Sequence, residues 1–179
     1  LALTQVPSEA IAPFKPWLAA HTLENAFYTA SGLTGRGAQI VLAEQYQAAG
    51  KSVESEFATQ DDVIEWFGAM TPTQDLQFLR YTLDNILAPA EAEAEKFDAW
   101  LRGDMRPAHA WMAQMKQRYP ELYAAIVVQR NANWLARIEA MLLARRPALV
   151  ITGLYHLAGP DNLPQLLAAS GFDARRVTA

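Results

Sequence analysis

Residues 148–156 read Ala-Leu-Val-Ile-Thr-Gly-Leu-Tyr-His, a continuous apolar run followed by a glycine and, three residues later, a histidine. An apolar run without polar alternation predicts a strand buried on both faces, as in a parallel sheet covered by helices. Ligands of open α/β sheets bind at the carboxyl ends of strands, where Gly153 permits a tight turn and His156 follows. This stretch therefore favours an α/β fold with a functional edge at His156.

The rest of the chain is predicted to be mostly helical. Two further short strands are expected, at residues 51–57, where Val53, Ser55 and Phe57 alternate with polar residues, and at residues 172–177. Periodicity, prolines and capping residues predict helices over residues 12–30, 39–49, 59–69, 71–86, 91–101, 107–118, 121–145 and 161–170. The expected fold is a mixed α+β domain, predominantly helical, with a small sheet.

A strand buried on both faces needs neighbours on both sides, and this sequence offers few candidates. The chain also opens with Leu1 rather than methionine. We therefore expect further strands of the sheet in a segment that precedes this chain.

Composition narrows the function further. The 179 residues suffice for one compact domain. The net charge of −4 argues against nucleic acid as the main partner, because duplex binding needs a concentrated basic face. The absence of cysteine excludes a disulfide framework, a thiolate nucleophile and cysteine-ligated metals. No run approaches the roughly 20 apolar residues of a membrane span, so no transmembrane segment is expected.

His156 is the first candidate for chemistry. Neutral imidazole ligates metals and transfers protons near neutral pH. The alternative is a histidine that only bonds a backbone carbonyl. His21 and His109 lie on predicted helices and are weaker candidates.

Asn131 and Arg130 form the second candidate. Asn131 shares a helical face with the apolar residues Val127, Trp134 and Ile138, and a buried amide must find hydrogen-bond partners there. Arg130 lies at the edge of this face. Both residues either face a site, or Asn131 is a structural amide bonded to a strand end and Arg130 is a surface residue.

Glu54 and Glu56 form the third candidate, because alternate residues of a strand point to the same face. Glu56, near the end of the predicted strand, is placed to act as a metal ligand or general base. The alternative is a solvated strand face.

These features together resemble the TraB/GumN family. Residues 129–139 (Gln-Arg-Asn-Ala-Asn-Trp-Leu-Ala-Arg-Ile-Glu) resemble its Arg-Asn-x-x-Trp helix, and residues 150–172 its closing Gly-x-x-His strand, helix and final strand. Lys15-Pro16-Trp17 is similar to its Pro-Trp helix start. Residues 48–56 are similar to its Ala-Gly-Lys strand leading to a glutamate. The resemblance covers essentially the whole chain, residues 1–179, as one domain, and is most specific in the last third.

The resemblance implies a Tiki-like domain, distantly similar to erythromycin-esterase-like proteins, with two Gly-x-x-His motifs and a glutamate around a divalent-metal peptidase centre. Carried over, His156, Glu56, Asn131 and Arg130 would be the catalytic residues, and His156 and Glu56 the ligands of Mn, Co or Zn. The first Gly-x-x-His motif is absent from this chain. We therefore expect a domain without its N-terminal strands and first motif, and an incomplete ligand set, since hydrolytic zinc sites show three protein ligands.

Three functions follow from this reasoning. The first is a metal-dependent, peptidase-like hydrolase with a peptide or small-molecule substrate. The second is a non-catalytic protein of the same fold that binds a peptide or another ligand. The third is an inactive fragment that assembles with missing strands, for example as a homodimer by strand exchange. The resemblance to bacterial members predicts a periplasmic or otherwise exported location, and the composition suits a cytoplasmic location as well.

Overall fold

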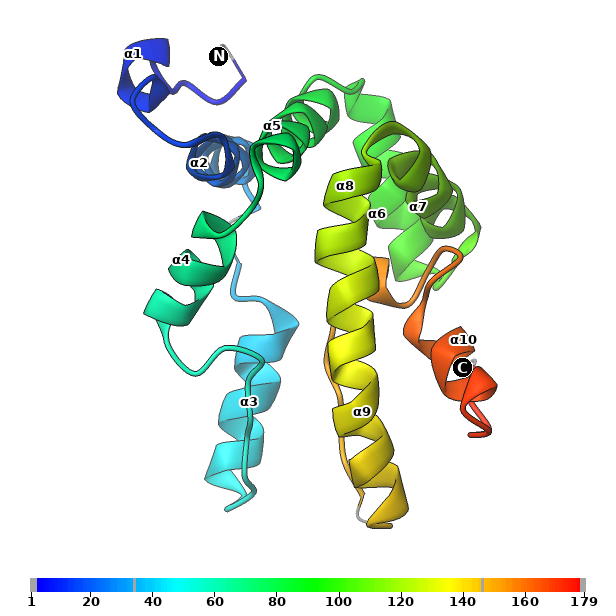
Figure 1. The fold of residues 1–179 in the computed structure, drawn as a ribbon. Coiled ribbons are helices and arrows are strands. Elements are labelled where there is room, and N and C mark those ends of the chain that lie inside the picture. Colours follow the sequence, from blue (N-terminus) through cyan, green and yellow to red (C-terminus); the bar gives the residue numbers. More distant parts are fainter. Residues whose placement is uncertain (1–2, 34, 146, 178–179) are drawn as a thin grey trace. The chain divides into compact units, whose positions relative to one another are not determined.

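The computed structural model describes residues 3–33, 35–145 and 147–177, and the chain divides into two compact units, Leu1–Leu87 and Ala88–Ala179. Helix is the only regular secondary structure of the described residues (Figure 1). Each unit is described by itself below.

The described residues of the N-terminal unit form five helices: α1 (Ser8–Ile11), α2 (Pro16–Ala30), α3 (Ala38–Ala48), α4 (Gln60–Gly68) and α5 (Pro72–Ile86). Helices α4 and α5 both begin at capping boxes. The side chain of the N-cap threonine, Thr59 or Thr71, accepts a hydrogen bond from the backbone N–H of the N3 residue, and the side chain of that residue, Asp62 or Gln74, accepts one from the backbone N–H of the threonine. The predicted starts at these threonines are thus confirmed. The four-residue α1 has no counterpart in the sequence prediction.

Helices α2 and α5 pack against each other to form the core of this unit. Its buried apolar residues are Ala19, Ala20, Leu23, Phe78 and Ile86. An aromatic cluster borders this core: Trp17 stacks on Phe67 at 5.5 Å between ring centroids, and His21 meets Phe67 and Phe78 edge-on at 4.5 and 5.0 Å. Burial lowers the pKa of His21. His21 is therefore half-buried at the edge of this core, in contact with its aromatic rings.

Asp75 of α5 caps the neighbouring helix α2. Lys15, at the N-cap position of α2, makes no side-chain capping bond, and the carboxylate of the buried Asp75 accepts the backbone N–H of Trp17 instead. A carboxylate at a helix N-terminus satisfies an unpaired N–H and interacts favourably with the helix dipole.

We expect Asp75→Ala to lower the free energy of unfolding by about 1–3 kcal/mol, because it leaves a backbone donor of α2 without its partner. Urea unfolding measures this difference. Thr73→Ala, at an exposed position in the same first turn of α5, is the matched control and should stay within about 0.5 kcal/mol of wild type. Equal effects of the two substitutions would contradict the capping role.

The C-terminal unit contains α6 (Ala90–Leu101), α7 (Arg106–Arg118), α8 (Pro120–Tyr123), the π-helical segment η1 (Ala124–Gln129), α9 (Arg130–Leu143), the short 3₁₀ turn η2 (Leu154–His156) and α10 (Leu163–Ala169). Segments α8, η1 and α9 follow one another without a break as one long helix, confirming the helix predicted near residues 121–145 (Figure 1). The core of this unit consists of Ala99, Ala108, Met112, Met115, Tyr119, Leu122, Tyr123, Ala125, Val127, Ala158 and Leu163.

The predicted α/β fold with a small sheet is wrong, because the part of the chain that the structure describes contains no strand. Residues 148–152 run as an irregular segment alongside α9 (Figure 1). Leu149, Val150 and Ile151 are 51%, 46% and 44% exposed, whereas a strand buried on both faces would hide them. A strand exists only when a neighbouring backbone pairs with its N–H and C=O groups, and the described residues supply no such ladder.

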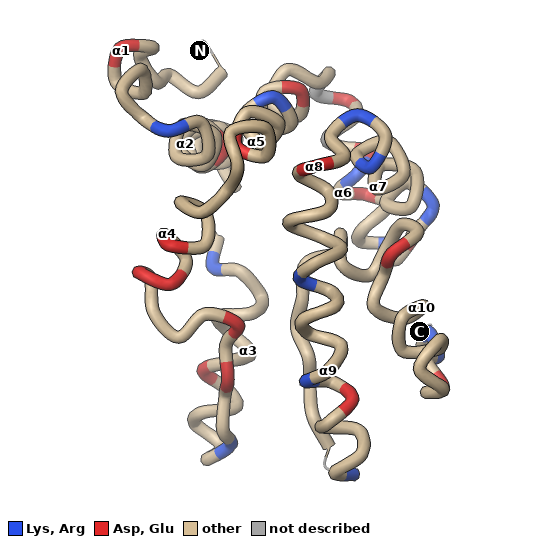
Figure 2. The backbone as a smooth tube through the Cα atoms, viewed as in Figure 1, with Lys and Arg blue, Asp and Glu red and all other residues tan. Residues whose placement is uncertain are grey.

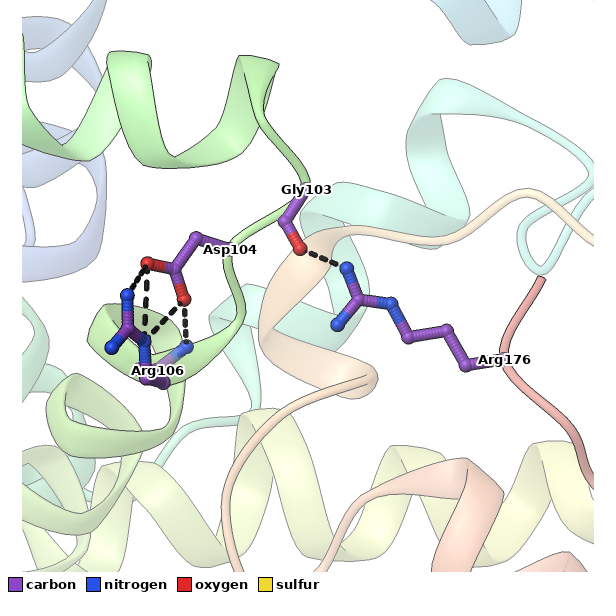
Figure 3. Close-up of polar contacts among 4 residues, drawn as sticks. All are labelled: Gly103, Asp104, Arg106 and Arg176. Carbon is purple, nitrogen blue, oxygen red and sulfur yellow. Dashed lines mark hydrogen bonds and ion pairs between the residues drawn. The ribbon is translucent and has the colours of Figure 1, made fainter. Parts of the chain in front are cut away.

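The predicted strands at residues 51–57 and 172–177 are wrong for the same reason. The last segment is instead held by a side chain: the Arg176 guanidinium donates to the carbonyl of Gly103, in the turn between α6 and α7 (Figure 3). Beside this contact, the side chain and backbone N–H of Arg106 donate to Asp104, and these bonds lower the pKa of Asp104.

Charged residues of both signs are distributed over the helices of both units (Figure 2). Within the described ranges, every helix is too short or too polar to cross a bilayer.

Candidate functional site

The amide of Asn131 lies at the centre of the candidate site in the C-terminal unit. Asn131 is fully buried and is the second residue of α9, directly after the π-helical segment. Its Nδ2 donates to the backbone carbonyl of Asp161 over 2.8 Å, and its Oδ1 lies 2.7 Å from Nδ1 of His156. The structure thus brings together two of the predicted residues, 25 positions apart. π-Helical segments within α-helices occur frequently at functional sites.

These two bonds determine the tautomer of His156. A backbone carbonyl only accepts hydrogen bonds, so the NH₂ group of Asn131 faces Asp161 and its oxygen faces the imidazole. Since the Asn131 oxygen also only accepts, Nδ1 of the neutral imidazole carries the proton. The lone pair of His156 is therefore on Nε2. A ring nitrogen held in this way, with the other nitrogen as the basic atom, is typical of catalytic and metal-binding histidines.

Trp134 of α9 packs against the histidine ring, and Arg130 packs in turn against Trp134. The Trp134 ring lies 4.4 Å from the His156 ring, between centroids, and the Arg130 guanidinium lies 4.8 Å over Trp134. Arg130 and Asn131 are adjacent in sequence but act differently: Asn131 bonds to the imidazole, and Arg130 places a positive charge beyond the indole.

The loop of residues 157–162 supplies the second half of the network. The Asp161 carboxylate accepts bonds from Lys116 Nζ at 2.8 Å and from the Tyr123 hydroxyl at 2.9 Å. Burial raises the pKa of Asp161, but the bonds from Lys116 and Tyr123 outweigh it, so the pKa lies below its usual value. Burial and the bond to Asp161 raise the pKa of Tyr123. Asp161 is therefore an anionic anchor between α7 and α8.

Gly159 and Asn162 of the same loop make three more bonds. The Gly159 N–H donates to His109 Nδ1 over 3.0 Å, and Asn162 Nδ2 donates to the Gly159 carbonyl over 2.6 Å. The Asn162 oxygen accepts the Gln165 N–H and thereby caps α10. The sequence predicts a helix that begins with Asp161 or Asn162 as its cap, and the structure has Asn162 there; the contacts of His109, Lys116 and Tyr123 were not predicted. The cap and the family resemblance of residues 150–172 pointed to this loop, and neither indicated these three contacts.

Glu56 and Glu54 lie elsewhere in the chain. Both are exposed and belong to the irregular segment before α4, in the N-terminal unit, whereas all the contacts described above lie within the C-terminal unit. Their predicted pairing on one face of a strand is wrong, since residues 51–57 form no strand. The role of Glu56 as ligand or base stays a prediction.

The donors around His156 do not fit a hydrolytic metal site. Among the described residues, no three histidine, aspartate or glutamate side chains gather closely enough to hold a metal ion. Of the groups in the network, the Asn131 amide is used at both ends and the Asp161 carboxylate binds an ammonium and a hydroxyl group. A hydrolytic metal needs about three protein ligands.

An apolar cavity of about 530 Å³ lies next to the histidine turn. It is lined by α9, the segment 148–152, α10 and the residues that follow α10, mainly through Ile138, Leu142, Val150, Ile151, Leu157, Leu163, Leu167 and Phe172. Leu157 directly follows His156 in the chain. Cavities of this size and character accommodate an apolar group of a small molecule or an apolar side chain of a peptide.

Gly159→Ala should destabilise the protein more than Gly171→Ala, although both glycines have a left-handed backbone, with φ of 85° and 89°. A Cβ at residue 159 would lie 2.5 Å from Met112 Cβ, whereas nothing lies within 4 Å of a Cβ at residue 171. Backbone strain costs each variant about 1–3 kcal/mol, and the clash adds to the first. Thermal unfolding of both variants measures this, and equal losses would refute tight packing of the loop on α7.

The contribution of Asp161 to stability should depend on pH. Because its pKa in the folded protein lies below the unfolded value of about 3.9, its bonds stabilise the fold above that pH and are lost as the pH falls through the folded pKa. We therefore expect the difference in unfolding free energy between wild type and Asp161→Asn to be greatest above about pH 5 and to shrink below about pH 4. Urea unfolding across this range tests it, with Asp98→Asn, at an exposed pair with Arg102, as control. A difference that does not change with pH would contradict the anionic anchor.

Comparison with known proteins supports the resemblance found in the sequence. The model of the TraB/PrgY/gumN family matches residues 1–176. No curated protein and no solved structure matches the chain. Since the family model covers nearly all of the sequence, including the helix of Asn131 and the turn of His156, the chain belongs to the TraB/PrgY/gumN family.

Proposed function

We propose that this protein is a peptidase-like hydrolase in which Nε2 of His156 transfers the proton. The observation that carries the proposal is the buried chain of bonds from the Asp161 carbonyl through the Asn131 amide to His156 Nδ1. A general base needs a defined basic atom and a fixed ring. These two hydrogen bonds supply both. Nε2 would accept a proton from the attacking water and return it to the leaving amine.

The neighbouring residues have separate roles in this proposal. Asn131 orients His156, because both ends of its amide are engaged. The Arg130 guanidinium, held over Trp134, would stabilise the negative charge that develops on the substrate carbonyl. The role of Glu56, in the N-terminal unit, as a general base or ligand rests on the family resemblance alone, and no step described here depends on it. The apolar cavity beside Leu157 would receive an apolar side chain of the substrate.

The predicted divalent ion, Mn, Co or Zn, would supply a polarised water molecule when bound. Because the described donors do not fit a three-ligand site, no step above depends on it. The ion, a homodimer and an exported, periplasmic location all stay predictions.

A second candidate function is binding of an apolar peptide without catalysis. The cavity of about 530 Å³ favours it, since its lining is mostly apolar, with Thr152 and Asp173 as its polar residues. The two functions differ in what His156 contributes: hydrolysis requires its basic atom, whereas binding in the cavity requires only the apolar lining.

Peptide hydrolysis by wild type and two variants distinguishes these functions. We expect wild-type protein, assayed with and without Mn, Co and Zn, to cleave peptides with apolar residues, and His156→Gln to lose about 10²–10⁴-fold of that rate, the usual contribution of a general base. Tyr155→Phe, at the exposed neighbouring position of the same turn, is the matched control and should keep the rate. Binding of the same peptides without cleavage under any of these conditions would refute the hydrolase and favour the binding function.

A further inference from the structure

We propose that Asp161 is the positioning residue that selects the tautomer of His156, and that Lys116 and Tyr123 act through it. The proposal deepens the hydrolase function and rests on it for the catalytic consequence, although the tautomer itself is measurable without activity. Asp161 is suited to this role because it joins three elements. Its carboxylate bonds to Lys116 on α7 and Tyr123 on α8, and its backbone carbonyl bonds to Asn131 on α9.

The Asp161 carbonyl decides which way the Asn131 amide points. If the amide turned over, its oxygen would face the Asp161 carbonyl oxygen, and two acceptors would lie about one hydrogen-bond length apart, at 2.8 Å. In that orientation the NH₂ group would face His156, and Nδ1 would have to carry the lone pair. The proton would then reside on Nε2, and the basic atom would be buried against α9. The position of one carbonyl therefore determines which ring nitrogen is the base.

The carboxylate of the same residue holds this carbonyl in place. Lys116 and Asp161 are 48% and 30% exposed, and ion pairs at such exposure are worth little by themselves. Tyr123, in contrast, is 1% exposed, and its hydroxyl would lose its partner if the carboxylate moved. A buried hydroxyl left unpaired costs more than a surface pair gains. Tyr123 is therefore the main anchor of Asp161, and Lys116 the secondary one.

The chain also restrains the loop independently at Gly159, through His109 and Asn162. Loss of the Asp161 anchor should therefore loosen the carbonyl locally without unfolding the loop. This makes the tautomer a more sensitive readout of the anchor than global stability.

Nitrogen-15 NMR of protein labelled in its three histidines tests the proposal directly, because the chemical shifts of ring nitrogens distinguish N–H from a lone pair. The spectrum of His156→Gln assigns the His156 signals by their disappearance. We expect wild type to show Nδ1–H at neutral pH. Tyr123→Phe and Asp161→Ala should each give a mixture of tautomers at His156, and Lys116→Met a smaller change.

Two variants serve as controls. Asp161→Asn keeps oxygen and nitrogen atoms at the anchor and should largely restore Nδ1–H, whereas Asp98→Asn, on α6, should leave the spectrum unchanged. If Asp161→Ala fails to fold, Tyr123→Phe removes a single hydroxyl and still gives the answer. An Nε2–H signal in wild type, or Nδ1–H retained in both Tyr123→Phe and Asp161→Ala, would overturn the proposal.

Kinetics separate this proposal from the proposed function. A hydrolase positioned by Asp161 should lose about 10–1,000-fold in kcat in Asp161→Ala with little change in KM, since the ring is misdirected but the cavity is intact. A tautomer that responds to Tyr123 and Asp161 in a protein that hydrolyses nothing would refute the hydrolase and keep the positioning role. A rate that depends on His156 but is unchanged in both anchor variants would refute the positioning role and keep the hydrolase.

Discussion

The C-terminal unit depends on one buried amide. Asn131 has no exposed surface, and leaving either end of its side chain unpaired would cost about 1–3 kcal/mol, a large share of a small domain's stability. Its partners come from the turn at His156 and from the loop at Asp161, both far along the chain from α9. The two bonds of Asn131 therefore fix the position of the segment 154–162 against the long helix. The orientation of the His156 ring follows from this arrangement, whereas the turn at Gly159 has its own bonds to His109 and Asn162.

In the N-terminal unit, too, a buried polar side chain links two helices. There too a polar side chain of one helix satisfies the backbone of another, since Asp75 of α5 caps α2. In both cases a buried polar side chain bonds to a backbone group of another element: Asp75 to the N–H of Trp17, and Asn131 to the carbonyl of Asp161. The difference lies in the consequence: the bond of Asp75 completes a helix end, whereas the bonds of Asn131 leave a histidine with a defined basic atom.

The helices were predictable because their signals are local. Thr59, Thr71 and Pro72 mark helix starts within a few residues of sequence, and the structure places α4 and α5 at those points. Strands were not predictable in this way. The apolar run at residues 148–152 has the composition of a buried strand. A strand forms only when the backbone of a distant segment pairs with it, and the described residues contain no segment that does so.

The features of the candidate site likewise differ in whether the sequence could predict them. A buried amide on an apolar face had to find partners, and the family resemblance drew attention to both Asn131 and His156. The anchor of Asp161 left no trace in the sequence, because Lys116 lies 45 residues away and a salt bridge has no periodicity. The tautomer of His156 likewise follows only from the direction of two hydrogen bonds, which are visible in three dimensions alone.

The π-helical segment Ala124–Gln129 sets the direction in which α9 presents its residues. Each residue of an α-helix turns the chain by about 100°, and a π-helical segment holds one residue more than an α-helical stretch that makes the same bonds. Everything after Gln129, including Asn131, is therefore rotated relative to where an uninterrupted α-helix would place it. The segment reads Ala-Ala-Ile-Val-Val-Gln and buries only Ala125 and Val127, so substitutions there should act as in any half-buried helix. Loss or gain of a single residue is a different kind of change: the helix would persist while the amide turned away from its partners. In this segment an insertion or a deletion should therefore disturb the contacts of Asn131 more than a substitution does.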